Sequence, residues 1–167
     1  MKNHPLTHKN PGARERGLAI VEFAVSLPFL LLMLVALTEL GRAFFTYAVL
    51  TKSVEVGARY VAAETLTSVG YADLTATKIL AARNLVMYGN IGGQGQRLVE
   101  GLDGGHITVA CTYGTSSGHC STNNGVAPVT VTAEVEFTPV MGTALNRLAG
   151  QAVFPVKLRA SSVMVAL

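Results

Sequence analysis

The longest apolar stretch of the chain lies near its start, between Leu18 and Leu37. Over these 20 residues, LAIVEFAVSLPFLLLMLVAL, the only ionisable side chain is that of Glu22. An α-helix rises about 1.5 Å per residue, so this segment would be about 30 Å long, which is the thickness of the hydrocarbon core of a bilayer. The pattern therefore predicts a helix that can span a membrane.

Apolar residues continue at steps of three and four beyond this segment, with polar residues on the other faces. The recurring apolar positions are Leu40, Phe44, Tyr47, Leu50, Val54, Ala58 and Val61. The pattern predicts one helix from about Leu18 to about Thr65, far longer than the helices of ordinary globular domains. Pro28 lies within it and is expected to bend or loosen the helix locally, because proline lacks a backbone N–H.

A second amphipathic helix is predicted for Ala72–Tyr88, after a break at residues 68–70. Gly89 and Asn90 are typical of a helix end, and the Gly89–Gly95 segment is expected to form a loop. The residues that this second helix is expected to bury are Leu74, Ile79, Leu80, Leu85 and Val86.

Alternating apolar and polar residues predict three strands, at His106–Tyr113, Val129–Phe137 and Gln151–Ala160. A short helical turn near Thr143–Leu148 is expected between the last two strands. The residues predicted to face inward are Ile107, Val109, Cys111 and Tyr113 in the first strand, Val129, Val131, Ala133, Val135 and Phe137 in the second, and Ala152, Phe154, Val156 and Leu158 in the third. The fold class is therefore α+β, with a long N-terminal helix and a second helix packed on one face of a small antiparallel sheet.

The net charge of +3 is concentrated at the N-terminus. Met1–Gly17 holds four of the 13 basic residues and one of the 10 acidic residues, so the other 150 residues carry nine of each. A neutral body offers no basic face to a phosphate backbone, and we expect no nucleic-acid partner. Basic residues before the span and mixed charges after it place the N-terminus in the cytoplasm. A cleaved secretory signal fits less well, because its apolar region would be about 7–15 residues long and free of charge.

Cys111 and Cys120 are the only cysteines of the chain. An exported domain lies in an oxidising compartment, so we expect a disulfide that closes the loop between them. A metal site completed by His106 or His119 is the weaker alternative, because two cysteines without paired C-x-x-C spacing are a poor zinc signal. Two free thiols remain possible if the domain is not exported, and no metal or cofactor is expected.

Two motifs resemble catalytic signatures without their structural context. The Gly114–Gly118 segment, GTSSG, matches G-x-S-x-G, but it lies in a predicted hairpin loop, whereas a nucleophile elbow joins a strand to a helix in a large parallel sheet. Ser116 is therefore interpreted as a turn residue. The Gly89–Gly95 loop lacks the spacing and the lysine of a phosphate-binding loop. Without an acid–base constellation elsewhere, we expect that the protein is not an enzyme.

Glu22 has two interpretations. A carboxylate within a membrane span costs up to roughly 2.5–3.5 kcal/mol at mid-bilayer and usually marks a functional residue with a partner. The alternative is a glutamate at the edge of the span that reaches the headgroups. If a peptidase cut after Gly17, Leu18 would gain an amino group with a pKa near 8. That amine, on the same chain or on a neighbouring subunit, could then neutralise Glu22.

These N-terminal residues resemble the signal of type IV pilins: a short basic leader, Gly17 before the cleaved bond, apolar Leu18, and Glu22 as the fifth residue of the mature chain. The run Arg16–Ala24, with Phe23 and then Pro28, and the later Val54–Tyr60 segment resemble the TadE-like minor pilins, or pseudopilins, of tight adherence pili. The resemblance implies cleavage by a prepilin peptidase and an assembly or docking role for Glu22, Phe23 and Pro28. Leu18 departs from the usual phenylalanine, which leaves N-methylation open.

The resemblance also implies a domain plan and a place in the cell. Residues 1–17 would be a cytoplasmic leader that is cleaved, 18–38 the transmembrane helix, 39–68 its exported continuation, and 69–167 a periplasmic α+β domain. The implied partners are prepilin peptidase, other pilin and pseudopilin subunits, the assembly platform of the bacterial inner membrane, and membrane lipid. The competing interpretation is an uncleaved, single-pass periplasmic protein-binding module. Whether the mature protein enters the fibre, sits at its tip or stays at its base is left open.

Overall fold

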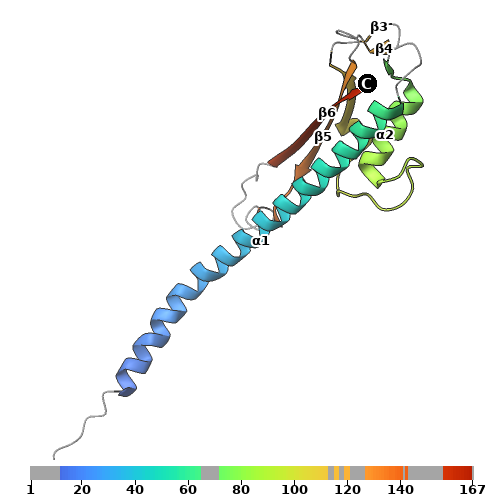
Figure 1. Ribbon diagram of the computed structural model, residues 1–167. Coiled ribbons are helices and arrows are strands. Elements are labelled where there is room, and N and C mark those ends of the chain that lie inside the picture. The colour runs from blue at the N-terminus through green and yellow to red at the C-terminus, as the bar shows by residue number, and fades with distance from the viewer. Residues whose placement is uncertain are drawn as a thin grey trace, which may run out of the picture. The chain divides into compact units, whose positions relative to one another are not determined.

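The fold begins with one long helix, α1 (Gly12–Glu64), seen in the computed structural model of the chain (Figure 1). The structure describes residues 12–64, 72–112, 115–116, 119–120, 127–140, 142 and 156–166. The chain divides into two units, of which the first ends at Leu40 and the second begins at Gly41. The predicted long helix is confirmed, and it starts some residues before Leu18.

Within the first unit, α1 continues through Pro28, with exposed side chains on every side of the helix. Proline cannot donate the usual backbone hydrogen bond, so the carbonyl one turn earlier loses that partner. Close to this point the Ser26 hydroxyl donates to the Phe23 carbonyl at 3.1 Å, and ten residues past Pro28 the Thr38 hydroxyl donates to the Val35 carbonyl at 2.8 Å. These local bonds satisfy the hydroxyl groups of Ser26 and Thr38 within the helix itself.

The second unit is built on an antiparallel three-stranded sheet with the order β2-β5-β6. The strands are β2 (Ile107–Cys111), β5 (Ala127–Phe137) and β6 (Val156–Ala166). Their register pairs Cys111 with Val129 and, at the two ends of the longer ladder, Ala127 with Ala166 and Phe137 with Val156. The long β5 and β6 strands run beside each other in Figure 1.

The core lies between the inner face of this sheet and two helices, the second half of α1 and α2 (Ala76–Tyr88). Thr75 caps the start of α2, and Gly89 ends it in the left-handed conformation at φ 73°, as expected for a helix-terminating glycine. The largest fully buried side chains are Leu50, Val54, Val61, Val86, Leu102, Ile107, Cys120, Val129 and Val131. The predicted fold class, α+β, is confirmed.

A second, smaller sheet has the order β1-β4-β3. Its strands have two residues each: β1 (Ala72–Asp73), β3 (Thr115–Ser116) and β4 (His119–Cys120). Cys120 pairs with Ala72 on one side and with Thr115 on the other. The segment at residues 72–73, predicted to open the second helix, therefore forms an edge strand instead, because α2 begins only after the Thr75 cap.

Further details of the sequence predictions were wrong, in α2 and in β6. Leu80, expected in the core, is 58% exposed because the face that α2 buries is set by Ala81, Ala82 and Val86. Val156, expected to face inward, is 52% exposed because it begins β6 at the open end of the sheet, whereas Leu158 packs against the core as predicted. The third strand also runs to Ala166, past its predicted end.

The first strand begins at Ile107, one residue later than predicted, because His106 belongs to a short 3₁₀ helix, Gly104–His106. Its inward residues Ile107, Val109 and Cys111 are confirmed, and so are all five inward residues of Val129–Phe137. Several predictions fall outside the described residues: Tyr113, Ala152, Phe154 and the helical turn at Thr143–Leu148.

Candidate functional site

The residues predicted to act in cleavage and assembly all lie on the first half of α1: Gly17, Leu18, Glu22, Phe23 and Pro28. Leu18 and Glu22 are four residues apart and therefore lie on one face of the helix, one turn from each other. A Cβ added at Gly17 would meet nothing within 4 Å. The structure thus brings Leu18 and Glu22 together on the helix surface and leaves both exposed.

The segment that follows Gly17 exposes large apolar side chains around the whole circumference of the helix. This surface is formed by Leu18, Ile20, Val21, Phe23, Val25, Leu27, Phe29, Leu30, Leu31, Leu32, Met33, Leu34 and Leu37. Soluble monomers rarely expose apolar patches of this extent, and a helix that is apolar on all faces normally lies in lipid or in a protein core. Among the described residues, this helix is the one that is long and apolar enough to cross a membrane, by length and composition.

Arg42 joins α1 to the end of the large sheet within the second unit. Its Nη2 atom donates a hydrogen bond of 2.7 Å to the carbonyl oxygen of Thr138. The guanidinium carbon also lies 4.4 Å from the centroid of the Phe137 ring, which is a cation–π contact. The last residue of β5 and the residue after it are therefore held by the first turn of α1 in this unit.

Farther along, α1 approaches α2 very closely at Gly57. A Cβ built at Gly57 would lie 2.6 Å from Cγ2 of Val86, which is closer than real Cβ contacts allow. Val86 is fully buried, and its β-branched side chain has little rotamer freedom in a helix. The absence of a side chain at Gly57 is thus what lets the two helices pack at this distance.

Cys111 and Cys120 form a disulfide, with their Cα atoms 5.4 Å apart. The predicted bond is therefore present, and it joins more than the ends of a loop: Cys111 ends β2 of the large sheet, and Cys120 lies in β4 of the small one. Both sulfurs are used in this bond. Of the histidines considered for a metal site, His106 instead pairs through Nδ1 with Asp103 at 2.8 Å.

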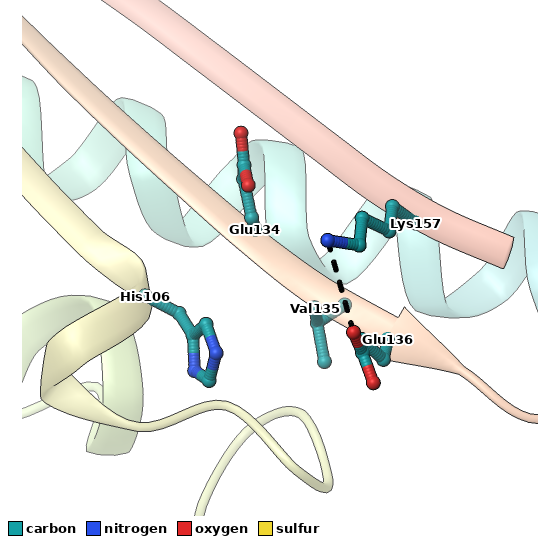
Figure 2. Close-up of a pocket in the computed structure, with 5 residues that line it drawn as sticks. All are labelled: His106, Glu134, Val135, Glu136 and Lys157. Atoms are coloured by element: carbon teal, nitrogen blue, oxygen red, sulfur yellow. Dashed lines mark ion pairs between the residues drawn. The ribbon is translucent and has the colours of Figure 1, made fainter. Parts of the chain in front are cut away.

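The outer face of the large sheet carries a shallow depression lined by His106, Glu134, Val135, Glu136 and Lys157. Figure 2 shows the Glu136 carboxylate turned toward the ammonium group of Lys157, at 3.8 Å. Within the part of the chain that the structure describes, no group of three or more metal-ligating side chains comes together. The charged groups of this face are exposed cross-strand pairs, which stabilise a sheet modestly and require no ligand.

Asp103, which pairs with His106 beside this depression, also caps the 3₁₀ helix Gly104–His106. The Asp103 carboxylate accepts a hydrogen bond of 3.0 Å from the Gly105 amide. Slight desolvation raises the pKa of Asp103, but the charge of His106 and hydrogen bonds from Gly105 and His106 outweigh it and lower the pKa below the ordinary value of 3.8. A carboxylate that stays ionised in this way is a good helix cap.

Neither of the two motifs that resemble catalytic signatures lies in a catalytic context. Ser116, interpreted from the sequence as a turn residue, instead belongs to the two-residue strand β3, which pairs directly with β4. The Gly89–Gly95 segment is a loop, held by the Asn90 side chain, whose oxygen accepts from the Gln94 amide at 3.1 Å. Neither segment precedes a helix in a parallel sheet, which is the context that their signatures need.

Sequence reasoning missed the two residues that tie α1 to the rest of the second unit, Arg42 and Gly57. Gly57 carried a usable signal, because glycine in a helix interior costs about 1 kcal/mol relative to alanine and therefore suggests a packing reason. Arg42 carried none, since its partner Thr138 is 96 residues away along the chain. A surface arginine that binds a distant carbonyl looks the same in the sequence as one that faces solvent.

Comparison with known proteins gives one family. The model of the TadE-like proteins matches residues 17–59, about a quarter of the chain. No curated protein and no solved structure matches the chain significantly. The matched residues begin at Gly17, contain the whole apolar surface and end just past the close approach at Gly57. Over residues 17–59 the chain is therefore similar to the TadE-like proteins.

Proposed function

We propose that the protein is a minor pilin, or pseudopilin, that takes part in assembly of a Tad-type adhesive pilus. In this role it is a structural subunit that uses no metal or cofactor and catalyses no reaction. The N-terminus lies in the cytoplasm, α1 crosses the inner membrane once, and residues 41–167 lie in the periplasm until assembly. Its partners are a prepilin peptidase, other pilin subunits and the membrane-bound assembly platform.

One observation carries the proposal: Glu22 is the single ionisable residue in the apolar segment, five positions after Gly17, inside the TadE-like match. An isolated carboxylate in lipid is expensive, so it is retained only where something cationic meets it. Cleavage after Gly17 creates that cation, because it leaves a new amine at Leu18, and an α-amino group in water has a pKa of about 8 and is protonated at neutral pH.

Pairing of this amine with a carboxylate is far stronger in lipid than at a protein surface, because the low dielectric strengthens attraction and makes an unpaired charge costly. Within one chain the amine and Glu22 are one helical turn apart. Between chains, Glu22 of an incoming subunit would meet the Leu18 amine of the last subunit added. The second arrangement fixes the axial register of neighbouring helices and thereby favours ordered assembly.

The size of the second unit supports a minor rather than a major role. A major pilin of these systems is little more than its apolar helix, whereas this chain adds a disulfide-bonded α+β unit with its own core. Such a unit is suited to priming or to a position at the tip or the base. The alternative function, an uncleaved membrane-anchored binding module, would share the same fold and keep its leader.

Processing distinguishes these two functions. We expect the membrane-extracted chain to lack residues 1–17 and its N-terminal sequence to begin Leu-Ala-Ile-Val-Glu. Gly17→Val should accumulate uncut, because a branched side chain obstructs the peptidase at the scissile bond. Gly41→Val is the matched control: it lies on the same helix, a Cβ there also meets nothing within 4 Å, and cleavage should stay normal. A wild-type chain that starts at Met1 contradicts the proposal.

The role of Glu22 is tested separately by Glu22→Gln, which removes the charge and keeps the size of the side chain. Insertion and cleavage should persist, while co-purification with other pilus subunits should fall. Glu39→Gln, which removes the carboxylate two residues after the apolar segment, controls for a general effect of charge. Normal pilus assembly by Glu22→Gln would show that Glu22 only reaches the headgroups from the edge of the span.

A further inference from the structure

The large sheet has one long edge that is open. Among the residues that the structure describes, β6 pairs with β5 on one side and has no neighbouring strand on the other, so it lies at the margin of the sheet (Figure 1). The opposite edge is formed by β2, which has five residues. There Arg83 on α2 donates a hydrogen bond of 3.1 Å to the carbonyl of Ile107, the first residue of the strand. The eleven residues of β6 are therefore the longest open edge of this sheet.

The sequence of β6 lacks most of the features that protect an edge strand. Edges are commonly blunted by proline, by bulges or by charged side chains. β6 contains no proline, its ladder with β5 runs without a bulge, and its charged residues, Lys157 and Arg159, both lie in its first half. Over Ala160–Ala166 the strand is uncharged, and Val163 and Val165 are 57% and 43% exposed. Such an edge can accept a further strand through backbone hydrogen bonds.

An antiparallel β6 strand from a second copy of the chain does not fit this edge in a membrane. Arg42 on α1 binds the carbonyl that follows β5 and stacks on Phe137, the partner of Val156, so the chain enters the unit at the end where β6 starts. An antiparallel pair of β6 strands has a two-fold axis normal to the sheet. The two chains would then enter at opposite ends of the pair, about 36 Å apart. Two copies anchored in one membrane must enter from the same side.

The other ways of pairing two copies are also unfavourable. A parallel pair of β6 strands turns one sheet over, because both strands must present the same open edge. Core-facing side chains of one copy, such as Leu158, would then continue the face that carries Lys157 and Arg159 of the other. Pairing of β6 with β2 of a second copy meets the edge at which Arg83 already occupies a backbone carbonyl. These geometries point to a different protein as the occupant of the edge.

The side chains of β6 indicate which kind of strand fits beside it. Lys157 and Arg159 each have one glutamate partner on β5, at 3.8 and 3.3 Å, yet their side chains are 69% and 67% exposed. Both keep N–H donors for a second carboxylate, and β6 has no acidic residue of its own. Opposite charges in neighbouring strands stabilise a sheet, and like charges destabilise it. A fitting strand therefore carries acidic residues beside the first half of β6 and apolar or β-branched residues elsewhere.

We propose that the open edge of β6 binds an extended segment of a different protein, which adds a strand to the large sheet and alternates acidic with apolar residues. Backbone hydrogen bonds would supply the affinity, and the two basic residues would fix the register. The exclusion of a second copy rests on the proposed anchoring of α1, whereas the open edge and its charge do not. The inference adds a partner-binding surface to the proposed pilus subunit.

The chain itself contains a strand of this chemistry, which provides the probe. In β5, Glu134 and Glu136 lie opposite Arg159 and Lys157. A labelled synthetic peptide of residues 127–137 is added to the full chain in lipid nanodiscs, and binding is measured by fluorescence anisotropy. Two further peptides carry N-methyl groups at either the odd-numbered or the even-numbered positions. A peptide with Glu134→Lys and Glu136→Lys controls for charge.

Neighbouring N–H groups of a strand point to opposite sides, so only one of the two methylated peptides loses the hydrogen bonds to β6. We expect that peptide to bind at least about tenfold more weakly and the other to bind nearly as well as the probe. The charge-reversed peptide should also bind about tenfold more weakly. Absence of binding, equal loss with both methylated peptides, or equal binding of the charge-reversed peptide would overturn the proposal.

Crosslinking determines where the probe binds. Ser161 lies opposite Thr132 in the ladder, so Ser161→Cys in the chain should form a disulfide with a peptide that carries Thr132→Cys. Thr108→Cys, exposed on β2, is the matched control and should not react. The reverse result would place the probe on the other edge, and disulfide-linked homodimers of Ser161→Cys in native membranes would identify a second copy as the occupant. Either result contradicts the proposal. Leader cleavage tests the proposed function separately, because none of these measurements depends on it.

Discussion

Gly57 shows how a single residue without a side chain determines the packing of two helices. The residue lies in the interior of α1, where glycine is unfavourable for backbone entropy, yet the Cβ of any other residue would overlap Val86. Two effects therefore oppose each other at this position. Alanine would gain up to about 1 kcal/mol of helix propensity, and overpacking against a buried valine costs typically about 1–3 kcal/mol.

Because Val86 is stiff and fully buried, we expect overpacking to prevail, so that Gly57→Ala lowers the free energy of unfolding by about 1 kcal/mol. Gly41→Ala has free space around the new Cβ and should raise it slightly. Val86→Ala combined with Gly57→Ala should cost less than the sum of the two single changes, since the smaller side chain makes room. Denaturant unfolding of the four variants measures these changes in the free energy of unfolding. Additive effects would contradict the steric argument.

At the scale of elements, the Cys111–Cys120 disulfide is a covalent cross-link between the two sheets, in addition to the backbone that runs from one to the other. The small sheet consists of two-residue strands, which hold little structure by themselves. By binding β4 to the end of β2, the disulfide holds the β3–β4 hairpin, and through it β1, against the larger sheet. We therefore expect loss of the disulfide to increase local opening mainly in the small sheet.

Closing a loop of this length contributes about 2–3 kcal/mol by restricting the unfolded chain. Cys111→Ser should therefore lower the free energy of unfolding by about that amount and speed amide exchange first in β1, β3 and β4. The double variant Cys111→Ser with Cys120→Ser is the control for a free thiol and should behave alike. Two thiols that can be alkylated without reductant in periplasmic protein would disprove the bond.

For the whole molecule, the distribution of buried residues separates an apolar helix from a unit with its own core. Between residues 17 and 49, no side chain that the structure describes is buried, and the core begins at Leu50. All of the long-range pairings within the two sheets fall after Gly41. Folding of the second unit should therefore not need the first 40 residues, even though α1 runs through both.

We predict that a fragment of residues 41–167, produced under oxidising conditions, is folded and unfolds in one cooperative thermal transition by circular dichroism. A fragment of residues 56–167 is the control, because it lacks Leu50 and Val54, each worth about 1.5–3 kcal/mol of buried surface. With a total stability of about 5–15 kcal/mol for a typical domain, this loss should unfold it or nearly so. A non-cooperative transition of the longer fragment would show that the apolar helix is needed for folding.

The sequence by itself determined the features of the fold that depend on local periodicity. The 20-residue apolar run, the continuation of α1, the Gly89 helix end and the alternation in β5 were all readable, because a helix repeats every 3.6 residues and a strand every two. The spacing of Glu22 to Gly17 was readable for the same reason, since both residues lie within a single helix. The disulfide followed from cysteine count and compartment.

Only the tertiary structure decided which surfaces meet. Leu80 had the right spacing for the core, but the packing of α2 turns it outward. The third strand, predicted to end at Ala160, continues as β6 to Ala166, because its partner residues in β5 continue the ladder to that point. The contacts of Arg42 with Thr138 and of Gly57 with Val86 join residues far apart in the chain. Such contacts depend on how elements pack, and a local pattern of apolar and polar residues does not contain that information.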